Sequence, residues 1–212
     1  MKPTNSLPLV SIITIVHNNV STIRNAIQSV AYQDYKKIEH IVIDNCSTDG
    51  TLEAIKEQSE DISLIISEPD DGIYYALNKG IKLANGEIIG FLNSDDVLKN
   101  KSIISKIVQN LITYDIDAIY GDLQYFSKKR PNRITRRWKS EQYSKKSFKA
   151  GWMPPHPTFY TYKSIYIKNG FFDTSYKISS DYDMMLRLLY DIKIKAKYIP
   201  NVLVKMQRGG IS

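Results

Sequence analysis

The sequence contains only one cysteine, Cys46, so no disulfide can form within the chain. Its first residues lack the long apolar core of a secretory signal peptide, and no apolar run approaches the roughly 18 residues of a membrane-spanning helix. A lone thiol without a signal peptide is typical of a reducing compartment. We therefore expect a cytoplasmic protein.

Two common phosphate-binding motifs are also missing. No GxGxxG follows the first apolar run, which excludes the dinucleotide-binding fingerprint, and no GxxxxGK(S/T) occurs, which excludes the phosphate loop of NTPases. If the ligand carries phosphate groups, we expect a cation to bind them.

The composition is otherwise that of an ordinary globular protein. The chain has 212 residues, 42% of them hydrophobic, and its 29 Lys and Arg against 22 Asp and Glu give a formal net charge of +7. This length is enough to bury a sizeable core. The excess positive charge favours an anionic partner, such as a nucleotide, a nucleic acid or a phospholipid surface.

Short β-branched runs alternate with helical patterns in the first part of the chain. The expected strands are residues 9–16, 38–44, 62–67, 87–92 and 117–126, and apolar residues at helical spacing follow each of the first four. This alternation predicts an α/β fold with a doubly wound, mostly parallel sheet flanked by helices.

The rest of the chain shows weaker patterns. Basic residues crowd residues 127–140 without periodicity, so we expect a solvated loop there. Residues 151–160 are too rich in proline for a helix interior, residues 180–190 have helical spacing, and residues 196–206 have an extended pattern.

Polar residues follow the first four predicted strands, at the edge where an open parallel sheet binds its ligands. They are His17, Asn18 and Asn19, then Asp44, Asn45, Ser47 and Asp49, then Glu68, Asp70 and Asp71, and finally Asn93, Ser94, Asp95 and Asp96. Turn formation or helix capping explains any single one of them, but the agreement of four loops favours one ligand crevice. Asp95 and Asp96 offer the hard oxygen donors that Mg²⁺ or Mn²⁺ prefers, with a diphosphate filling other coordination sites.

Several segments together resemble the family 2 glycosyltransferases of the GT-A fold. They are VSIITIVHNN, IVIDNCSTDGT, EPDDGIYYALNKGIKLANGEIIGFLNSDDVL, PHPTFY and SSDYDMMLRL, and they cover nearly the whole chain in the family's order. The resemblance implies a single GT-A domain over residues 1–212, in which residues 1–126 bind the nucleotide sugar and residues 127–212 form the acceptor and catalytic half. It also implies inverting transfer of a sugar from a nucleotide diphosphate donor, with uridine favoured, to an acceptor hydroxyl, with Mn²⁺ or Mg²⁺ as cofactor.

The resemblance also assigns donor-side residues by position. Asp44 corresponds to the carboxylate that accepts a hydrogen bond from the base, and Asp95 to the metal ligand of the family's Asp-x-Asp. Asn93 departs from that motif because it supplies no charge, although its amide can bond a ribose hydroxyl or coordinate the cation. The nucleotide-binding residues implied in this way are Thr14, Val16, His17, Asp44, Asp70, Asn93 and Ser94.

On the acceptor side, Asp181 occupies the position of the family's catalytic carboxylate, so we expect it to act as general base. Capping of the following helix is its alternative role. His156 and Trp152 are expected to line the acceptor pocket, with core packing as the alternative for both. Arg208 resembles a tail element that folds over the donor phosphates.

Seven basic residues without an acid among them lie between positions 128 and 139: Lys128, Lys129, Arg130, Arg133, Arg136, Arg137 and Lys139. Beside the solvated-loop interpretation, this segment suits peripheral attachment to an anionic membrane that carries a lipid-linked acceptor, or contact with nucleic acid. We favour the membrane, at its inner face, and expect no nucleic acid partner. The leading function is synthesis of a surface or secreted polysaccharide, and the alternatives are a catalytically silent nucleotide-binding relative, a nucleotidyltransferase or a nucleic-acid-binding module.

Overall fold

A computed structural model of the chain describes residues 7–127 and 130–207, and one sheet runs through them. Its first part is a parallel block in the order β3 (Leu64–Ser67), β2 (Ile38–Asp44), β1 (Val10–Val16) and β4 (Ile88–Phe91). β1 has the sequence VSIITIV, and its side chains are nearly all buried because helices cover both faces of the sheet. The carboxyl ends of these four strands therefore meet at one edge.

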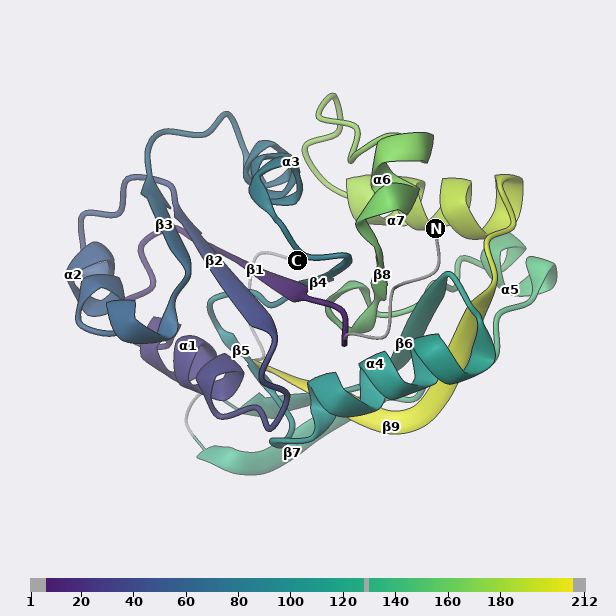
Figure 1. The fold of residues 1–212 in the computed structure, drawn as a ribbon, viewed down its shortest axis with the longest axis horizontal. Coiled ribbons are helices and arrows are strands. Elements are labelled where there is room, and N and C mark those ends of the chain that lie inside the picture. Colours follow the sequence, from purple (N-terminus) through teal and green to yellow (C-terminus); the bar gives the residue numbers. More distant parts are fainter. Residues whose placement is uncertain (1–6, 128–129, 208–212) are drawn as a thin grey trace.

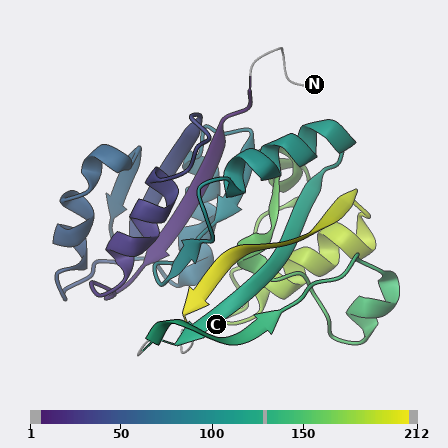
Figure 2. The same cartoon turned by 90° about the horizontal axis from the view of Figure 1, so that it is seen from below.

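The second part of the sheet mixes strand directions. β8 (Tyr160–Tyr162) pairs antiparallel with both β4 and β6 (Ala118–Ser127), and so joins the two parts. β9 (Ala196–Gln207) runs parallel to β6, as Figure 2 shows, and β5 (Asp96–Leu98) pairs antiparallel with β9 at the edge. β7 (Arg130–Trp138) pairs antiparallel with the C-terminal part of β6.

Helices cover the two faces of the curled sheet, as predicted (Figure 1). On one face, α1 (Ile23–Ala31), α2 (Thr51–Lys56) and α4 (Ile103–Tyr114) pack on clusters that include Val10, Ile12 and Val42. On the other face lie α3 (Ile73–Leu83), α5 (Lys145–Lys149), α6 (Lys163–Asn169) and α7 (Ser180–Met185). A π-helical segment, Leu186–Asp191, continues α7.

Helix α3 sits close to the sheet because Gly80 faces β1. A Cβ atom at this position would lie 2.5 Å from Ile13 Cγ2, which is closer than two carbon atoms can pack. The helix begins after Gly72, whose φ of +136° favours glycine. Gly72 thus ends the loop that follows β3, and Gly80 allows the helix after it to pack closely on β1.

The predicted strands and helices of the first 126 residues are present within a few residues of their expected bounds. The expectation of a loop at residues 127–140 is wrong, since β7 occupies most of this segment. The side chains of Arg133, Ile134, Thr135, Arg136 and Arg137 are all exposed. Because none of them is buried, no apolar alternation marks the strand, and backbone pairing with β6 holds it instead.

Within residues 7–127 and 130–207, no helix has the length and apolar character needed to cross a membrane.

His40 on β2 makes stability depend on pH, because burial lowers its pKa from 6.5 to about 4. The unfolded chain binds this proton below about pH 6.5 and the folded chain does not, so stability is full above that pH and is lost as the pH falls toward about 4. Between about pH 7.5 and about pH 5 we expect the wild type to lose about 2 kcal/mol more free energy of unfolding than His40→Gln. Urea denaturation at both pH values measures this, and equal losses in the two proteins would contradict it.

Candidate active site

Hydrogen bonds join the four loops that follow β1, β2, β3 and β4. His17 Nδ1 lies 2.8 Å from the carbonyl oxygen of Asn45, so the first loop contacts the second. The backbone N–H of Asp70 donates to Asn45 Oδ1 at 2.8 Å and ties the third loop to the second. Asn19 Nδ2 donates to Ser94 Oγ at 2.9 Å and ties the first loop to the fourth. The structure thus brings the four groups of polar residues together.

Asp44 ends β2 and is fully buried. Ser67 Oγ donates to Asp44 Oδ2 at 2.7 Å, and the backbone N–H of Ser47 donates to the same oxygen at 3.1 Å. A buried carboxylate requires such donors, and here they come from the ends of two neighbouring strands and loops. They fix the orientation of Asp44 without using all of its acceptor sites.

The three candidates from the first strand lie in different surroundings. Thr14 is fully buried, and its Oγ1 lies 3.0 Å from His40 Nε2, so its hydroxyl is already engaged. Val16 is buried, and its carbonyl oxygen accepts the N–H of Asn45. His17 is exposed. Of these three side chains, His17 is the one that a ligand can reach from solvent.

Lys79 on α3 fixes the loop after β3. Its ammonium lies 2.6 Å from both Glu68 Oε1 and Asp70 Oδ1, and the side chain of Asp70 is only 4% exposed. Burial alone would lower the pKa of Lys79, but hydrogen bonds to Asp70 and Glu68 outweigh it and raise the pKa. Asp70 Oδ2 is buried and has no hydrogen-bond partner in the described part of the chain.

The two aspartates of the loop after β4 differ in burial. Asp96 is fully buried, and Asn93 Nδ2 donates to its Oδ2 at 3.1 Å. Burial and the charge of Asp95 raise the pKa of Asp96 well above its ordinary value. Asp95 is half-buried, and therefore lies nearer to solvent than Asp96. Asn19 and Thr22 hold Ser94, the residue before Asp95: Asn19 Nδ2 donates to its Oγ, and Thr22 Oγ1 donates to its carbonyl oxygen at 2.8 Å.

Among residues 7–127 and 130–207, no group of three or more His, Cys, Asp or Glu side chains could hold a metal ion. The side chains that this loop could offer to a cation are the carboxylate of Asp95 and the neutral amide oxygen of Asn93. Such a set fits a divalent cation that takes its other oxygens from bound phosphates, and it does not fit a cage made wholly of protein.

Asp181 comes from the other half of the chain, in the first turn of α7. Tyr74 Oη donates to Asp181 Oδ1 at 3.3 Å. His156, in a short 3-10 turn, is near enough for the charge of Asp181 to favour its protonated form, but burial has the larger effect and lowers the pKa of His156. Its Nε2 is buried and has no partner among the described residues. The structure therefore places two acceptor-side candidates within electrostatic reach of each other.

Trp152 and Arg208 are less informative. The Trp152 ring packs edge-to-face on Tyr120 and on Phe148, with ring centroids 6.2 Å apart in both pairs, and it remains half-buried. Packing against the core therefore engages part of this side chain. Arg208 lies outside the described residues.

Sequence patterns did not single out Tyr74, which bonds Asp181, Phe172, which packs against His156, or Asn78, which bonds the Phe172 backbone. Tyr74 and Asn78 lie four residues apart and hence on one face of α3. The one signal in the sequence is that these polar residues recur at helical spacing among apolar core residues, and this signal does not identify the residues that they contact.

A model of glycosyl transferase family 2 matches residues 11–181. The chain belongs to this family. The glycosyltransferase assignment made from the sequence is therefore confirmed.

Relatives agree with this assignment. An uncharacterized glycosyltransferase of Mycobacterium tuberculosis is 31% identical over 185 residues, which cover 86% of this chain and 69% of that protein. TuaG of Bacillus subtilis, a glycosyltransferase provisionally named for teichuronic acid biosynthesis, is 36% identical over 103 residues, which cover 47% of this chain and 41% of its own length.

Solved structures share the fold of this glycosyltransferase. Residues 1–349 of TarS from S. aureus, in complex with UDP-GlcNAc, match with a TM-score of 0.77 and 17% identity over 96% of this chain. The mannosyltransferase PcManGT of Pyrobaculum calidifontis, in complex with GDP-Man and Mn²⁺, matches with a TM-score of 0.71 and 20% identity over 97% of this chain. The predicted GT-A fold is thus confirmed. The chain spans about 60% of the length of both solved chains.

Proposed function

We propose that the protein transfers a sugar from a nucleotide diphosphate sugar to an acceptor hydroxyl with inversion at the anomeric carbon. The observation that carries this proposal is the meeting of two kinds of group from two halves of the chain. Four strand-end loops joined by hydrogen bonds bring polar side chains together, and helix α3 links the third of these loops, through Lys79, to the Asp181 carboxylate on α7, through Tyr74.

Residues 1–126 bind the nucleotide in this proposal. Asp44 accepts an N–H of the base, since its carboxylate is fixed yet retains acceptor capacity. His17, Asp70, Asn93 and Ser94 surround the remainder of the nucleotide, and Val16 and Thr14 support the pocket from the strand. We favour UDP as the nucleotide, and the relatives solved with UDP-GlcNAc and with GDP-Man show that the fold accommodates either type of base.

A divalent cation fits the loop after β4. Asp95 would hold it, with Asn93 as a neutral neighbour, and Mn²⁺ in the related mannosyltransferase supports this choice of cofactor. When bound, such a cation stabilises the charge of the leaving diphosphate. Arg208, which lies outside the described residues, is proposed to add a positive charge there.

Residues 127–212 form the acceptor side. The Asp181 carboxylate removes the acceptor hydroxyl proton while the acceptor oxygen attacks the anomeric carbon from the face opposite the diphosphate. The bond to the diphosphate breaks with its electron pair, and the configuration inverts. His156, held neutral by burial, and Trp152 line the acceptor pocket in this proposal.

The acceptor is a sugar, free or lipid-linked, in the synthesis of a surface polysaccharide. The name of TuaG supports this class of pathway. The exposed side chains of β7 support contact with an anionic membrane surface: Arg136 stacks on Tyr125 and Trp138, with its guanidinium 5.5 Å and 5.8 Å from the ring centroids. No acidic side chain of the described chain pairs with Arg133 or Arg136, whereas Arg137 pairs with Asp122 at 3.1 Å.

The alternative function is a catalytically silent relative that binds a nucleotide without turnover. The uncharged Asn93 in the position of a family aspartate favours it, because one fewer charge weakens the hold on a cation. Nucleotide binding without release of a nucleoside diphosphate would identify the silent relative, and binding with release would identify the transferase.

Asp181→Asn should lower the rate of nucleoside diphosphate release by about 100- to 10,000-fold, the usual contribution of a general base. Calorimetric titration with UDP should give nearly the same affinity as wild type, since Asp181 lies outside the nucleotide pocket. Asp183→Asn is the matched control and should keep wild-type activity. Wild-type turnover by Asp181→Asn would remove this residue from the role of base.

Nucleotide binding should depend on the cation through Asp95. We expect calorimetric titration with UDP, GDP, CDP and dTDP to show one preferred nucleotide in Mn²⁺ and weak binding in EDTA. Asp95→Asn should reduce the Mn²⁺-dependent affinity at least about tenfold, because it removes the charged ligand. Asp61→Asn is the control, and should change it little because Asp61 is exposed and lies outside the four loops. Equal losses in the two variants would contradict the assignment of Asp95.

Membrane contact predicts sedimentation with vesicles of equal parts phosphatidylglycerol and phosphatidylcholine at low salt, and release at high salt. The double variant Arg133→Glu, Arg136→Glu should lose this binding. Lys36→Glu, Lys37→Glu changes the charge equally at another exposed site and should retain it. If wild type stays in solution but retards an RNA oligonucleotide, the exposed arginines of β7 bind nucleic acid instead.

A further inference from the structure

Tyr74 is buried at the junction of the two halves of the site, and the donor site does not use it. Its side chain is on α3, 8% exposed, and its hydroxyl donates to Asp181 Oδ1 across 107 positions of sequence. The one proton of the phenol can therefore go to the carboxylate.

The ring of Tyr74 is held in place by a second contact between the same segments. It stacks on Phe172, with ring centroids 5.7 Å apart. The side chain of Asn78 makes two hydrogen bonds to the backbone of Phe172. Asn78 Nδ2 donates to the Phe172 carbonyl oxygen at 2.8 Å, and the Phe172 N–H donates to Asn78 Oδ1 at 3.0 Å. Tyr74 and Asn78 thus act from one face of α3 to hold the segment that leads into α7.

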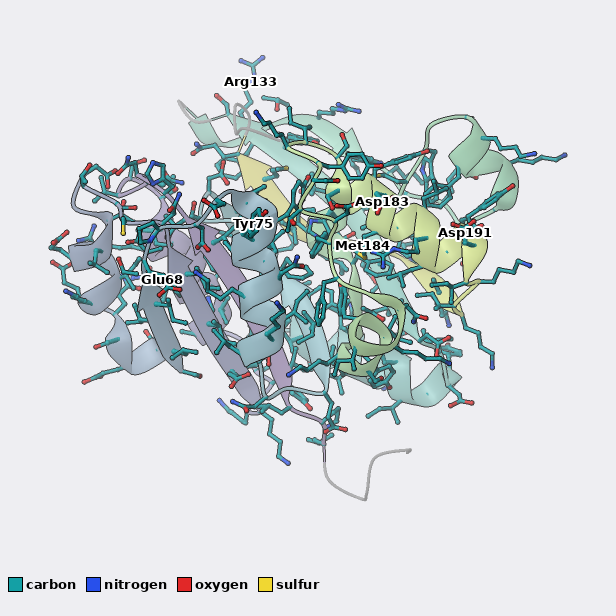
Figure 3. All side chains as sticks on the ribbon, turned by 90° about the horizontal axis from the view of Figure 1, so that it is seen from above. Glu68, Tyr75, Arg133, Asp183, Met184 and Asp191 are labelled. Carbon is teal, nitrogen blue, oxygen red and sulfur yellow. The ribbon has the colours of Figure 1, made fainter. Side chains whose placement is uncertain are left out.

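Helix α3 also carries Lys79, which binds Glu68 and Asp70 in the loop after β3. Figure 3 shows α3, with Tyr75 labelled, between the strand that ends near Glu68 and the helix that carries Asp183 and Met184. One helix therefore contacts the donor-side loop and the helix of the base.

The hydroxyl of Tyr74 remains protonated near neutral pH. Burial raises the pKa of Tyr74, and the negative charge of Asp181 raises it further. The tyrosine is consequently a donor to the carboxylate and does not compete with it for the acceptor proton.

We propose that Tyr74 is the positioning residue of the base: its hydroxyl holds Oδ1 of Asp181, which leaves Oδ2 to take the acceptor proton. Asn78 supports this position by fixing Phe172 under the tyrosine ring. The inference rests on the proposed role of Asp181. Its physical basis is that a base displaced by a fraction of an ångström from the line of proton transfer loses much of its effect.

Tyr74→Phe tests the inference because it keeps the stacked ring and removes only the hydroxyl. We expect kcat with the nucleotide sugar that the titrations select to fall about tenfold or more. The KM of the donor, the affinity for UDP and the melting temperature should stay close to wild type. Tyr75→Phe is the matched control: this neighbouring tyrosine is 42% exposed, and its variant should keep wild-type kinetics. A wild-type kcat in Tyr74→Phe, or an equal loss in Tyr75→Phe, would overturn the inference.

A second measurement needs no substrate. In protein labelled with ¹³C at tyrosine Cζ, the resonance of Tyr74 is identified by its loss in Tyr74→Phe. It should shift in Asp181→Asn and stay in place in Asp183→Asn; no shift in Asp181→Asn would overturn the inference. The two proposals fail separately. Full turnover by Asp181→Asn would contradict the role of Asp181 as base. An inactive Asp181→Asn together with a fully active Tyr74→Phe would contradict only the positioning role of Tyr74.

Discussion

Parallel pairing of β3, β2, β1 and β4 is the constraint on which the rest of the structure depends. Because these strands run in one direction, their loops leave the sheet at one edge and are close enough to bond to each other. The bonds among Asn19, Asn45, Asp70 and Ser94 follow from that geometry. They convert four separately encoded loops into one polar surface whose side chains have defined orientations, as a site for a nucleotide requires.

Helix α3 extends that order into the second half of the chain. Its packing against β1 requires Gly80, and its face toward α7 carries Tyr74 and Asn78. It thereby supplies the hydrogen bond from Tyr74 to Asp181, on a six-residue helix whose Met184 and Met185 are buried in the core. The aromatic rings of Phe91 and Phe172 pack against the His156 ring, with centroids 5.0 Å and 5.5 Å away, and surround this region with apolar groups.

Charge is distributed unevenly over the molecule. Acidic side chains gather at the strand-end loops, although the chain as a whole carries a formal charge of +7, and exposed arginines gather on β7. A diphosphate approaching the acidic loops requires a compensating cation, whereas β7 attracts anions without one. The two surfaces therefore suit different partners, and both charge patterns are legible in the sequence.

The sequence by itself determined the alternation of strands and helices and the polar ends of four strands, because both depend on local spacing. The resemblance of several motifs identified the family and the position that Asp181 occupies in it. The sequence did not determine β7, whose exposed side chains leave no apolar period, or the burial that separates Asp96 from Asp95. Only the tertiary structure showed that Tyr74 and Asn78 reach Asp181 and Phe172, since these contacts span 107 and 94 positions. Hydrogen bonds between residues so far apart in sequence depend on how the two parts of the sheet pack together, and local sequence patterns do not predict that packing.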